Sequence, residues 1–309
     1  MKIISKIGRE DLAIVYIAET TRGHMVEFVE SIQPPLPREK KWVLIVSTLY
    51  GCPVSCKMCD AGSFYYGRIT KEDILSQIDI PVTNRFPDRV IKTEKFKIQF
   101  ARMGEPSFNM NVLDVLEELP ELYKVPMIMP SISTIAPQSS DKFFQKLVDI
   151  KNSLYGNGNF QMQFSIHTTN ERQRDELLPI KKWSFEKIAN YGETFFQNGD
   201  RKITLNFAAS NEYPIEPVII FRYFDPHKYI IKITPLNPTY HAKKNNLTSL
   251  INPDSESNSR ILADKFKELG YEVLVSVGEF EENKIGSNCG QYIRKHFMSE
   301  EKLEEAYKY

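Results

Sequence analysis

Hydrophobic residues follow two different periods along the chain. From Trp42 onward, short apolar runs rich in Val, Ile and Phe alternate with longer stretches in which apolar residues recur every three or four positions. The short runs predict buried β-strands, and the longer stretches predict amphipathic helices. The predicted strands are Val43–Ser47, Lys97–Ala101, Pro126–Ile132, Phe160–Ile166, Ile203–Ala208 and Tyr229–Ile233, and the helices between them include Lys71–Ile78, Val112–Leu122, Asp141–Ile150 and Phe185–Phe196.

This alternation predicts the fold class. Six strands separated by helices favour parallel βα units, because parallel strands need a crossover connection, which a helix supplies. An open, partial (β/α)6 barrel of the α/β class satisfies the count. In barrels of this kind the chemistry gathers at the carboxyl ends of the strands. We therefore expect functional residues in the loops that follow the predicted strands.

The segments on either side of the alternating region have other patterns. Before it lie three short strand-like runs and a proline-rich, charged linker, and after it lie one more helix and one more strand. These elements are the strands Lys2–Ile7, Leu12–Ala18 and Met25–Val29, the helix Ser257–Leu269 and the strand Tyr271–Val277. We predict a small N-terminal antiparallel β appendage with its linker in residues 1–40, and a core with a C-terminal extension in residues 41–309.

Composition and charge narrow the function classes. Lys and Arg together number 40, as do Asp and Glu, so no overall positive field marks the chain as a nucleic-acid-binding protein. The N-terminus lacks the apolar core of a signal peptide, and no apolar window is long enough to span a membrane. Four cysteines, three of them clustered, suit a reducing compartment better than a disulfide framework. We expect a cytoplasmic protein with no membrane partner.

The clustered cysteines predict a metal centre. Cys52, Cys56 and Cys59 lie within eight residues of one another, after an apolar run. A [4Fe–4S] cubane is held by four thiolates, so three of them leave one iron open for a small chelating ligand. A structural zinc site needs a fourth Cys or His, and the nearest histidine, His24, lies far upstream. Buried free cysteines are the other alternative, but they seldom form such a triplet.

Several further motifs share one order along the chain. They are Val46–Cys52 with Cys59–Gly62, Arg68–Thr70, Met103–Pro106 with Asn109, Ser133–Ile135, Ser165–His167, Pro235–Pro238, Ser257–Ile261 and Asn288–Gln291. Each is weak alone, but their shared order resembles the RlmN/Cfr family of radical S-adenosylmethionine (SAM) methyltransferases, which methylate adenosine carbons in RNA. The resemblance therefore implies that the partial barrel is a radical SAM barrel.

The resemblance also implies the cofactors. A [4Fe–4S] cluster would be held by Cys52, Cys56 and Cys59, with SAM chelating its open iron. One electron from a donor such as flavodoxin or ferredoxin would break a carbon–sulfur bond of SAM and release a 5′-deoxyadenosyl radical. The implied SAM-binding residues are Gly104, Glu105, Ser133, Ser165, Ile166, His167 and Asn237. Considered singly, these residues have simpler alternatives, namely a solvated loop glutamate, turn-capping side chains and a structural histidine.

The last cysteine, Cys289, matches the family's methyl-carrying cysteine. There, one SAM methylates the thiol, and the radical from a second SAM abstracts hydrogen from that methyl group before it adds to an sp2 carbon. A polar, glycine-containing loop around Cys289 suits this role, although lone cysteines are usually inert. The family's second catalytic cysteine would fall at Ile45, which cannot act as a base. Glu27, which resembles a family glutamate, is a candidate replacement, as is a group on the substrate.

The substrate and the outcome of the reaction stay open in the sequence. The family's helical RNA-binding domain would precede the β appendage, and this chain begins at the appendage. With zero net charge, we expect either RNA or a smaller molecule as substrate, because phosphate contacts supply most nucleic-acid affinity. Methylation of an sp2 carbon is the leading reaction. The alternatives are non-methylating radical chemistry and a non-catalytic RNA-binding or regulatory descendant.

Overall fold

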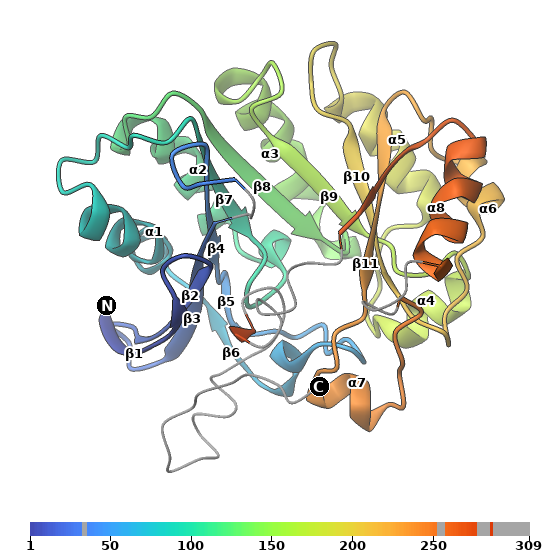
Figure 1. The fold of residues 1–309 in the computed structure, drawn as a ribbon, viewed down its shortest axis with the longest axis horizontal. Helices are drawn as coiled ribbons and strands as arrows, with labels where there is room; N and C mark the ends of the chain where they lie inside the picture. The colour runs from blue at the N-terminus through green and yellow to red at the C-terminus, as the bar shows by residue number, and fades with distance from the viewer. Residues whose placement is uncertain (33–35, 252–256, 277–284, 287–309) are drawn as a thin grey trace.

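The computed structural model describes residues 1–32, 36–251, 257–276 and 285–286. Within these ranges, one curved sheet of ten strands runs through the molecule in the order β1-β2-β3-β4-β7-β8-β9-β10-β11-β12, and helices line it on one side (Figure 1). A separate two-stranded hairpin, β5–β6, lies at one end of this sheet. No described helix has the length and apolar content that a membrane crossing requires.

The parallel part of the sheet confirms the predicted α/β class. All six predicted strands are present, and each pairs in parallel with the next one along the chain. A seventh parallel strand from the C-terminal extension, β12 (Glu272–Val275), adds to the far edge. The six strands are β4 (Lys41–Val46), β7 (Lys95–Phe100), β8 (Ile128–Thr134), β9 (Gln161–Ser165), β10 (Ile203–Ala209) and β11 (Tyr229–Pro235).

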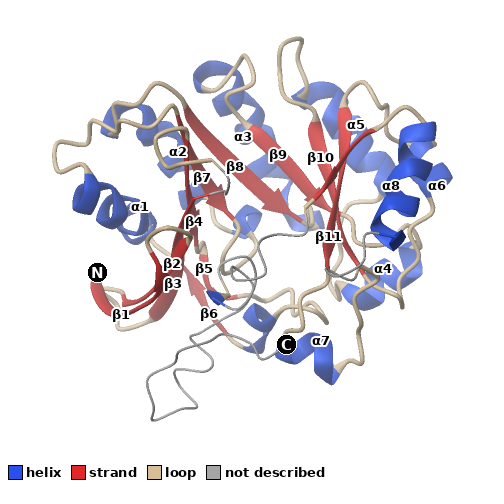
Figure 2. Cartoon of the chain, viewed as in Figure 1, coloured by secondary structure: helices blue, strands red, loops and turns tan. Residues whose placement is uncertain are grey.

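Helices connect these strands and cover the outer face of the sheet (Figure 2). Their starts follow local capping rules: the Thr70 side chain accepts from Asp73 N at the start of α1, and the Ser184 side chain accepts from Lys187 N at the start of α5. The helices are α1 (Lys71–Arg85), α2 (Asn111–Leu122), α3 (Asp141–Leu154), α4 (Glu171–Leu177), α5 (Phe185–Phe195), α6 (Pro217–Phe221), α7 (Tyr240–Lys244) and α8 (Ser257–Glu268), with 3-10 turns η1 (Asp60–Ser63), η2 (Pro106–Phe108) and η3 (Gln138–Ser140).

The two faces of the sheet differ in polarity. Outward-facing residues such as Leu44, Ile98 and Leu205 are fully buried in one large hydrophobic cluster with the helices. The alternate, inward-facing positions carry polar side chains, because successive residues of a strand point to opposite faces. Among them are Lys97, Gln163, Ser165, Asn206 and Lys232. The hydrophobic core therefore lies outside the curved sheet, and its inner face is left for polar ligands.

The N-terminal strands form the expected antiparallel meander, and they continue the main sheet. They are β1 (Lys2–Arg9), β2 (Ala13–Glu19) and β3 (Met25–Ile32). β3 pairs antiparallel with β4, where Val29 lies opposite Ile45. The strands on the two sides of residue 40, β3 and β4, are joined by a hydrogen-bonded ladder. The domain boundary near residue 40 stays a prediction.

Candidate active site

The two ends of the loop that carries the three cysteines are hydrogen-bonded to one side chain. Asn109, buried after η2, donates from Nδ2 to the carbonyl oxygens of Thr48 and Ile69, each at 2.8 Å. Thr48 N in turn donates to Met103 O at 2.8 Å. Since Thr48 and Ile69 flank the cysteine segment, these bonds close the loop at its base, directly beyond the carboxyl ends of β4 and β7.

A short hairpin that sequence patterns did not predict frames this loop. β5 (Leu49–Gly51) pairs antiparallel with β6 (Tyr65–Arg68). Gly51 has a φ of 83°, and a Cβ atom there would lie 1.9 Å from the carbonyl oxygen of Phe64. Only glycine fits this close approach. The hairpin was missed because strands of three and four residues are too short for a period to show.

The three cysteine thiols lie in a protected environment. Cys52 is buried and Cys56 and Cys59 are partly buried, and Cys59 N donates to Cys56 O at 3.1 Å in a tight turn. Burial raises the pKa of Cys52 to about 11. Burial also raises the pKa of Cys56 well above its ordinary value, with smaller contributions from Cys52 and Glu105. Thiolates in this loop therefore need a cation beside them.

This donor set is compatible with an iron–sulfur cluster. Among the described residues, no three Cys, His, Asp or Glu side chains converge on a point that would hold one metal ion. In a cubane each thiolate binds a different iron, so the thiols need not converge. A positively charged centre also offsets the cost of ionising buried thiols. Cys52, Cys56 and Cys59 are accordingly the residues that would hold the cluster.

A segment far along the chain holds the cysteine loop from the other side. Three successive carbonyl oxygens of the loop accept hydrogen bonds from side chains around α7. The donors are Asn245 Nδ2 to Lys57 O at 2.9 Å, Thr239 Oγ1 to Met58 O at 2.8 Å and His241 Nδ1 to Cys59 O at 2.7 Å. The Asp60 carboxylate accepts from His241 N at 2.9 Å, next to the amino end of α7. The sequence carried no signal for this contact, because the two segments meet only in the folded chain.

Gly104 and Glu105 follow β7 at the same edge. Gly104 has a φ of 94°, and a Cβ atom there would lie 2.4 Å from Leu49 Cβ, so a side chain would push this loop away from β5. Glu105 is buried, and burial raises the pKa of its carboxyl group. Its oxygens accept from Ser107 Oγ at 2.7 Å, Ile135 N at 3.0 Å and Thr134 Oγ1. These donors orient a carboxylate that a neighbouring cation would stabilise further.

The other expected SAM-binding residues also lie at the carboxyl ends of the parallel strands. Ser133 is the last but one residue of β8 and accepts from Gln163 Nε2 at 3.1 Å. Ser165 ends β9 opposite Asn206 of β10, and Ile166 N donates to Asn206 O at 2.9 Å. Asn237 follows β11, and its carbonyl oxygen accepts from Thr239 N at 2.8 Å. Strands β7, β8, β9 and β11 therefore each contribute to one edge of the sheet.

His167 has an unusual backbone and a defined tautomer. Its φ is 65°, in the left-handed region, and its side chain is buried. Burial, with a smaller contribution from the Arg174 charge, lowers the pKa of His167 to about 3, so the ring is neutral. Its Nδ1 accepts from Ala208 N at 3.1 Å, which leaves the proton on Nε2. The ring can therefore donate one hydrogen bond from Nε2 to a ligand.

Glu27 is the candidate partner of Cys289, and Ile45 stands where the family's second catalytic cysteine would fall. Glu27 is fully buried and forms an ion pair with Arg102, with Oε1 and Nε 2.9 Å apart. Ile45 packs against a small apolar cluster that includes Val29 and Met103. Cys289 lies outside the described residues, so the structure brings neither Glu27 nor Ile45 into a described contact with it.

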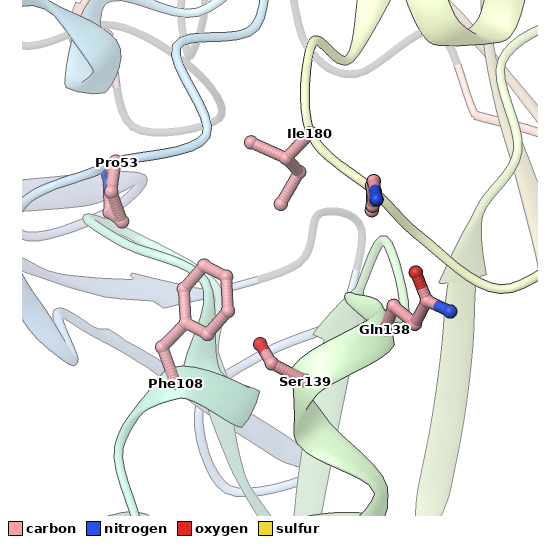
Figure 3. A pocket seen from close by; sticks show the side chains of 6 residues that line it. Pro53, Phe108, Gln138, Ser139 and Ile180 are labelled. Atoms are coloured by element: carbon pink, nitrogen blue, oxygen red, sulfur yellow. The ribbon is translucent and has the colours of Figure 1, made fainter.

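A pocket that the sequence did not indicate opens beside the cysteine loop (Figure 3). Its volume is about 370 Å³. Its lining residues come from the segments after β5 and α4 and from the turns η2 and η3, with Pro53 and Phe108 on one side and Ile180 facing them. Gln138, Ser139 and Lys181 complete the lining. Apolar walls with a few polar groups are typical of sites for organic ligands.

The fold and the edge of the sheet can be compared with known proteins. A curved parallel sheet whose first strand leads into a three-cysteine loop resembles the arrangement of radical SAM enzymes. The chain aligns with a radical SAM methyltransferase from Sphaerobacter thermophilus at a TM-score of 0.70 and 18% identity, over 94% of this chain and 80% of that one. This likeness confirms the radical SAM methyltransferase fold.

Sequence comparisons identify the relatives. The chain is 24% identical over 291 residues to a probable dual-specificity RNA methyltransferase RlmN of Thermosipho melanesiensis, covering 91% of this chain and 79% of the relative. It is also 24% identical to the protein of the same name from Pseudothermotoga lettingae, covering 90% and 78%. No protein-family model matches the chain. The resemblance to RlmN-type radical SAM methyltransferases that the motifs indicated is therefore confirmed.

Proposed function

We propose that this chain is a radical SAM methyltransferase of the RlmN-like type, which methylates an sp2 carbon of RNA or of a smaller molecule. The observation that carries the proposal is the common location of the cysteine loop, the Gly104–Glu105 loop and the ends of β8, β9 and β11 at one edge of the sheet. The relatives, named as RNA methyltransferases, support the reaction type. A cytoplasmic location and a flavodoxin-like or ferredoxin-like electron donor remain predictions of this proposal.

The chain's own residues would hold and orient the cofactors. Cys52, Cys56 and Cys59 would bind the [4Fe–4S] cluster, which, with SAM chelated to it, supplies the one electron that breaks a carbon–sulfur bond and yields a 5′-deoxyadenosyl radical. Glu105, held by its three donor groups, would accept the ammonium group of SAM in a charge-assisted contact. The neutral ring of His167 would donate from Nε2.

Ser133, Ser165, Ile166 and Asn237 would complete the SAM site. Serine and asparagine side chains suit ribose hydroxyl groups and a carboxylate, since they both donate and accept. The backbone of Ile166 is already oriented by Asn206 O. Gly104 keeps its loop against β5, where any side chain would meet Leu49.

Cys289 is the proposed methyl carrier, and Glu27 is the proposed group that resolves its adduct with the substrate. The ion pair with Arg102 opposes this role for Glu27 as the proton acceptor, because a neighbouring cation makes a carboxylate a weaker base. The pair would have to open, or the substrate would have to supply the group.

Non-methylating radical chemistry is a second candidate function, favoured by Ile45. This residue occupies the position of the family's second cysteine and packs with Val29 and Met103 in an apolar cluster. No acid or base is available at that position. An enzyme without this group would release its product by a different route from the family.

One experiment separates these functions. The protein is reconstituted with iron and sulfide without air, supplied with a strong reductant and methyl-labelled SAM, and analysed by peptide mass spectrometry. Label on Cys289 supports the methyl-carrier route, and 5′-deoxyadenosine without label supports the non-methylating alternative. Failure to bind iron in the wild type, with the Cys56→Ala variant behaving identically, would refute both.

A further inference from the structure

Several lysines lie on the inner face of the sheet, away from the edge that carries the cysteine loop. Lys41 and Lys95 lie opposite each other at the amino ends of β4 and β7. Lys97, two residues further along β7, is 7% exposed. Lys232 lies on β11 and is partly buried. These four residues alternate with the outward-facing core residues, so they point to the inner face.

The curvature of the sheet brings these cations together across its interior. β7 and β11 are separated by three strands in the sheet order. Nevertheless, Lys232 is among the positive charges that lower the pKa of Lys97, after burial and Lys41 and before Arg201 and Lys95. Burial also lowers the pKa of Lys232. Lys97 and Lys232 also occupy inward-facing positions of β7 and β11, so their side chains extend from two parts of the curved sheet into the interior that it encloses.

Three of these lysines, Lys95, Lys97 and Lys232, differ from the buried Lys151 in their partners. Lys151, which is 1% exposed, forms an ion pair with Asp200. By contrast, no ion pair joins Lys95, Lys97 or Lys232 to a carboxylate in the part of the chain that the structure describes. Lys97 Nζ instead donates to the neutral Gln161 Oε1 at 2.8 Å. A buried ammonium group without a counter-ion is costly, so an anion at this place would stabilise the protein.

A second, independent observation points to a ligand in the same space. Asn206 is 9% exposed, and within the described residues its Oδ1 has no hydrogen-bond partner. On the inner face, Asn206 lies opposite Ser165 of β9 on one side and opposite Lys232 of β11 on the other. Buried side-chain amides rarely leave an oxygen unpaired. Asn206 Oδ1 is thus a free hydrogen-bond acceptor, within the described residues, between Ser165 and Lys232.

We propose that the inner face between Lys97 and Lys232 binds a small phosphate-bearing molecule, with its phosphate beside the two ammonium groups and a donor of the same molecule on Asn206 Oδ1. Phosphate matches several ammonium groups at once, because it offers three acceptor oxygens and up to two negative charges. The assignment of this molecule as the methyl acceptor rests on the proposed function. The anion site itself does not rest on the proposed function.

The position of the lysines favours a small molecule over a nucleic-acid strand. Gln161, the partner of Lys97, lies four residues before Ser165 on β9, which corresponds to about 13 Å along a strand. A molecule bound here would reach from the lysines towards the SAM-binding edge. Because Lys97 is buried inside the curved sheet, a continuous phosphodiester backbone would have little access to it.

The test uses the protein without cluster or SAM, so its result does not depend on the proposed function. Thermal unfolding and calorimetric titration are measured with inorganic phosphate, adenosine 5′-monophosphate and a short single-stranded RNA. We expect the first two to bind and to raise the melting temperature. Lys97→Met and Lys232→Met should each weaken this binding about tenfold or more, and should raise the melting temperature of the ligand-free protein by about 2–4 °C, because an uncompensated buried charge is removed.

The matched control is Lys142→Met, on the exposed surface of α3, which should change neither quantity. The proposal is overturned if phosphate and the mononucleotide do not bind the wild type, or if they bind equally well to the Lys97 and Lys232 variants. Lower melting temperatures in both ligand-free variants would mean that the lysines are structural. Tighter Lys97-dependent binding of RNA than of the mononucleotide would replace the small molecule by a strand.

Discussion

His241 Nδ1 lies 2.7 Å from the carbonyl oxygen of Cys59, a contact between residues 182 positions apart. Because a carbonyl oxygen only accepts, Nδ1 carries the proton and Nε2 is left to accept from Ser63 Oγ at 3.4 Å. The imidazole ring therefore bridges the two ends of the turn that includes η1. With Thr239 and Asn245 it fixes the backbone of the cysteine loop.

The first prediction concerns this bridge. His241→Ala should leave the fold intact but loosen the cluster loop, because one of three successive carbonyl contacts is lost. A hydrogen bond of this kind contributes about 1 kcal/mol, so loss of iron to a chelator should accelerate about 2- to 10-fold. The visible absorbance of the reconstituted protein reports the rate. His227→Ala is the matched control, since His227 is exposed and, among the residues that the structure describes, its side chain bonds to nearby Asp225. Equal rates in both variants would contradict the bridging role.

The second prediction concerns the pH dependence of thiol reactivity. Only a thiolate reacts with an alkylating agent, and burial raises the pKa of Cys52 to about 11. In the metal-free protein, alkylation of Cys52 should therefore be slow at neutral pH and should keep rising through pH 10, where an ordinary cysteine has levelled off. Peptide mass spectrometry of timed samples measures it, with urea-unfolded protein as the reference. A plateau near pH 9 in the folded protein would show that the thiol is not protected.

The third prediction concerns Glu105. Because burial raises the pKa of this carboxyl group, its ionisation opposes folding, and its contribution to stability is lost as the pH rises through the folded-state pKa. Glu105→Gln should thus flatten the decline in stability of the cofactor-free protein between the ordinary pKa of a glutamate and the raised folded-state pKa. The same change should weaken SAM binding about 10- to 100-fold, since a charge-assisted bond is replaced.

Calorimetric titration of SAM into reconstituted protein measures the second effect. Glu118→Gln serves as the control, because Glu118 is a surface carboxylate paired with Lys71 on the outer helices. If Glu105→Gln binds SAM as well as the wild type does, the ammonium contact is wrong.

The fourth prediction concerns Gly104. Gly104→Ala should lower the free energy of unfolding by about 1–3 kcal/mol, because its φ of 94° disfavours a side chain and the new Cβ would meet Leu49. Adding Leu49→Gly, which removes the Cβ and Cγ atoms that the new Cβ would meet, should restore only the steric part. Urea unfolding of the two single variants and the double variant measures the coupling. Strict additivity of the two changes would show that the loop does not approach β5 as closely as described.

Local patterns were sufficient for the elements of the barrel. All six strands and four of the helices between them were predicted from apolar period alone, although α1 runs to Arg85 rather than to the predicted Ile78. The spacing of Cys52, Cys56 and Cys59 likewise indicated the metal chemistry. These features are local, since a period, a cap or a short spacing depends only on neighbours in the chain.

Contacts between residues that are far apart in the sequence were seen only in the folded chain. Register and curvature made Val29 the neighbour of Ile45, brought His241 to Cys59, and turned Lys97 and Lys232 towards one interior. No local pattern contains that information. Alternation along a strand predicts which side chains share a face, but the residues that lie opposite one another depend on the order and register of all the strands in the sheet. The candidate functional residues were therefore predicted from short motifs, whereas the surroundings that set their pKa values and contacts arose from long-range packing.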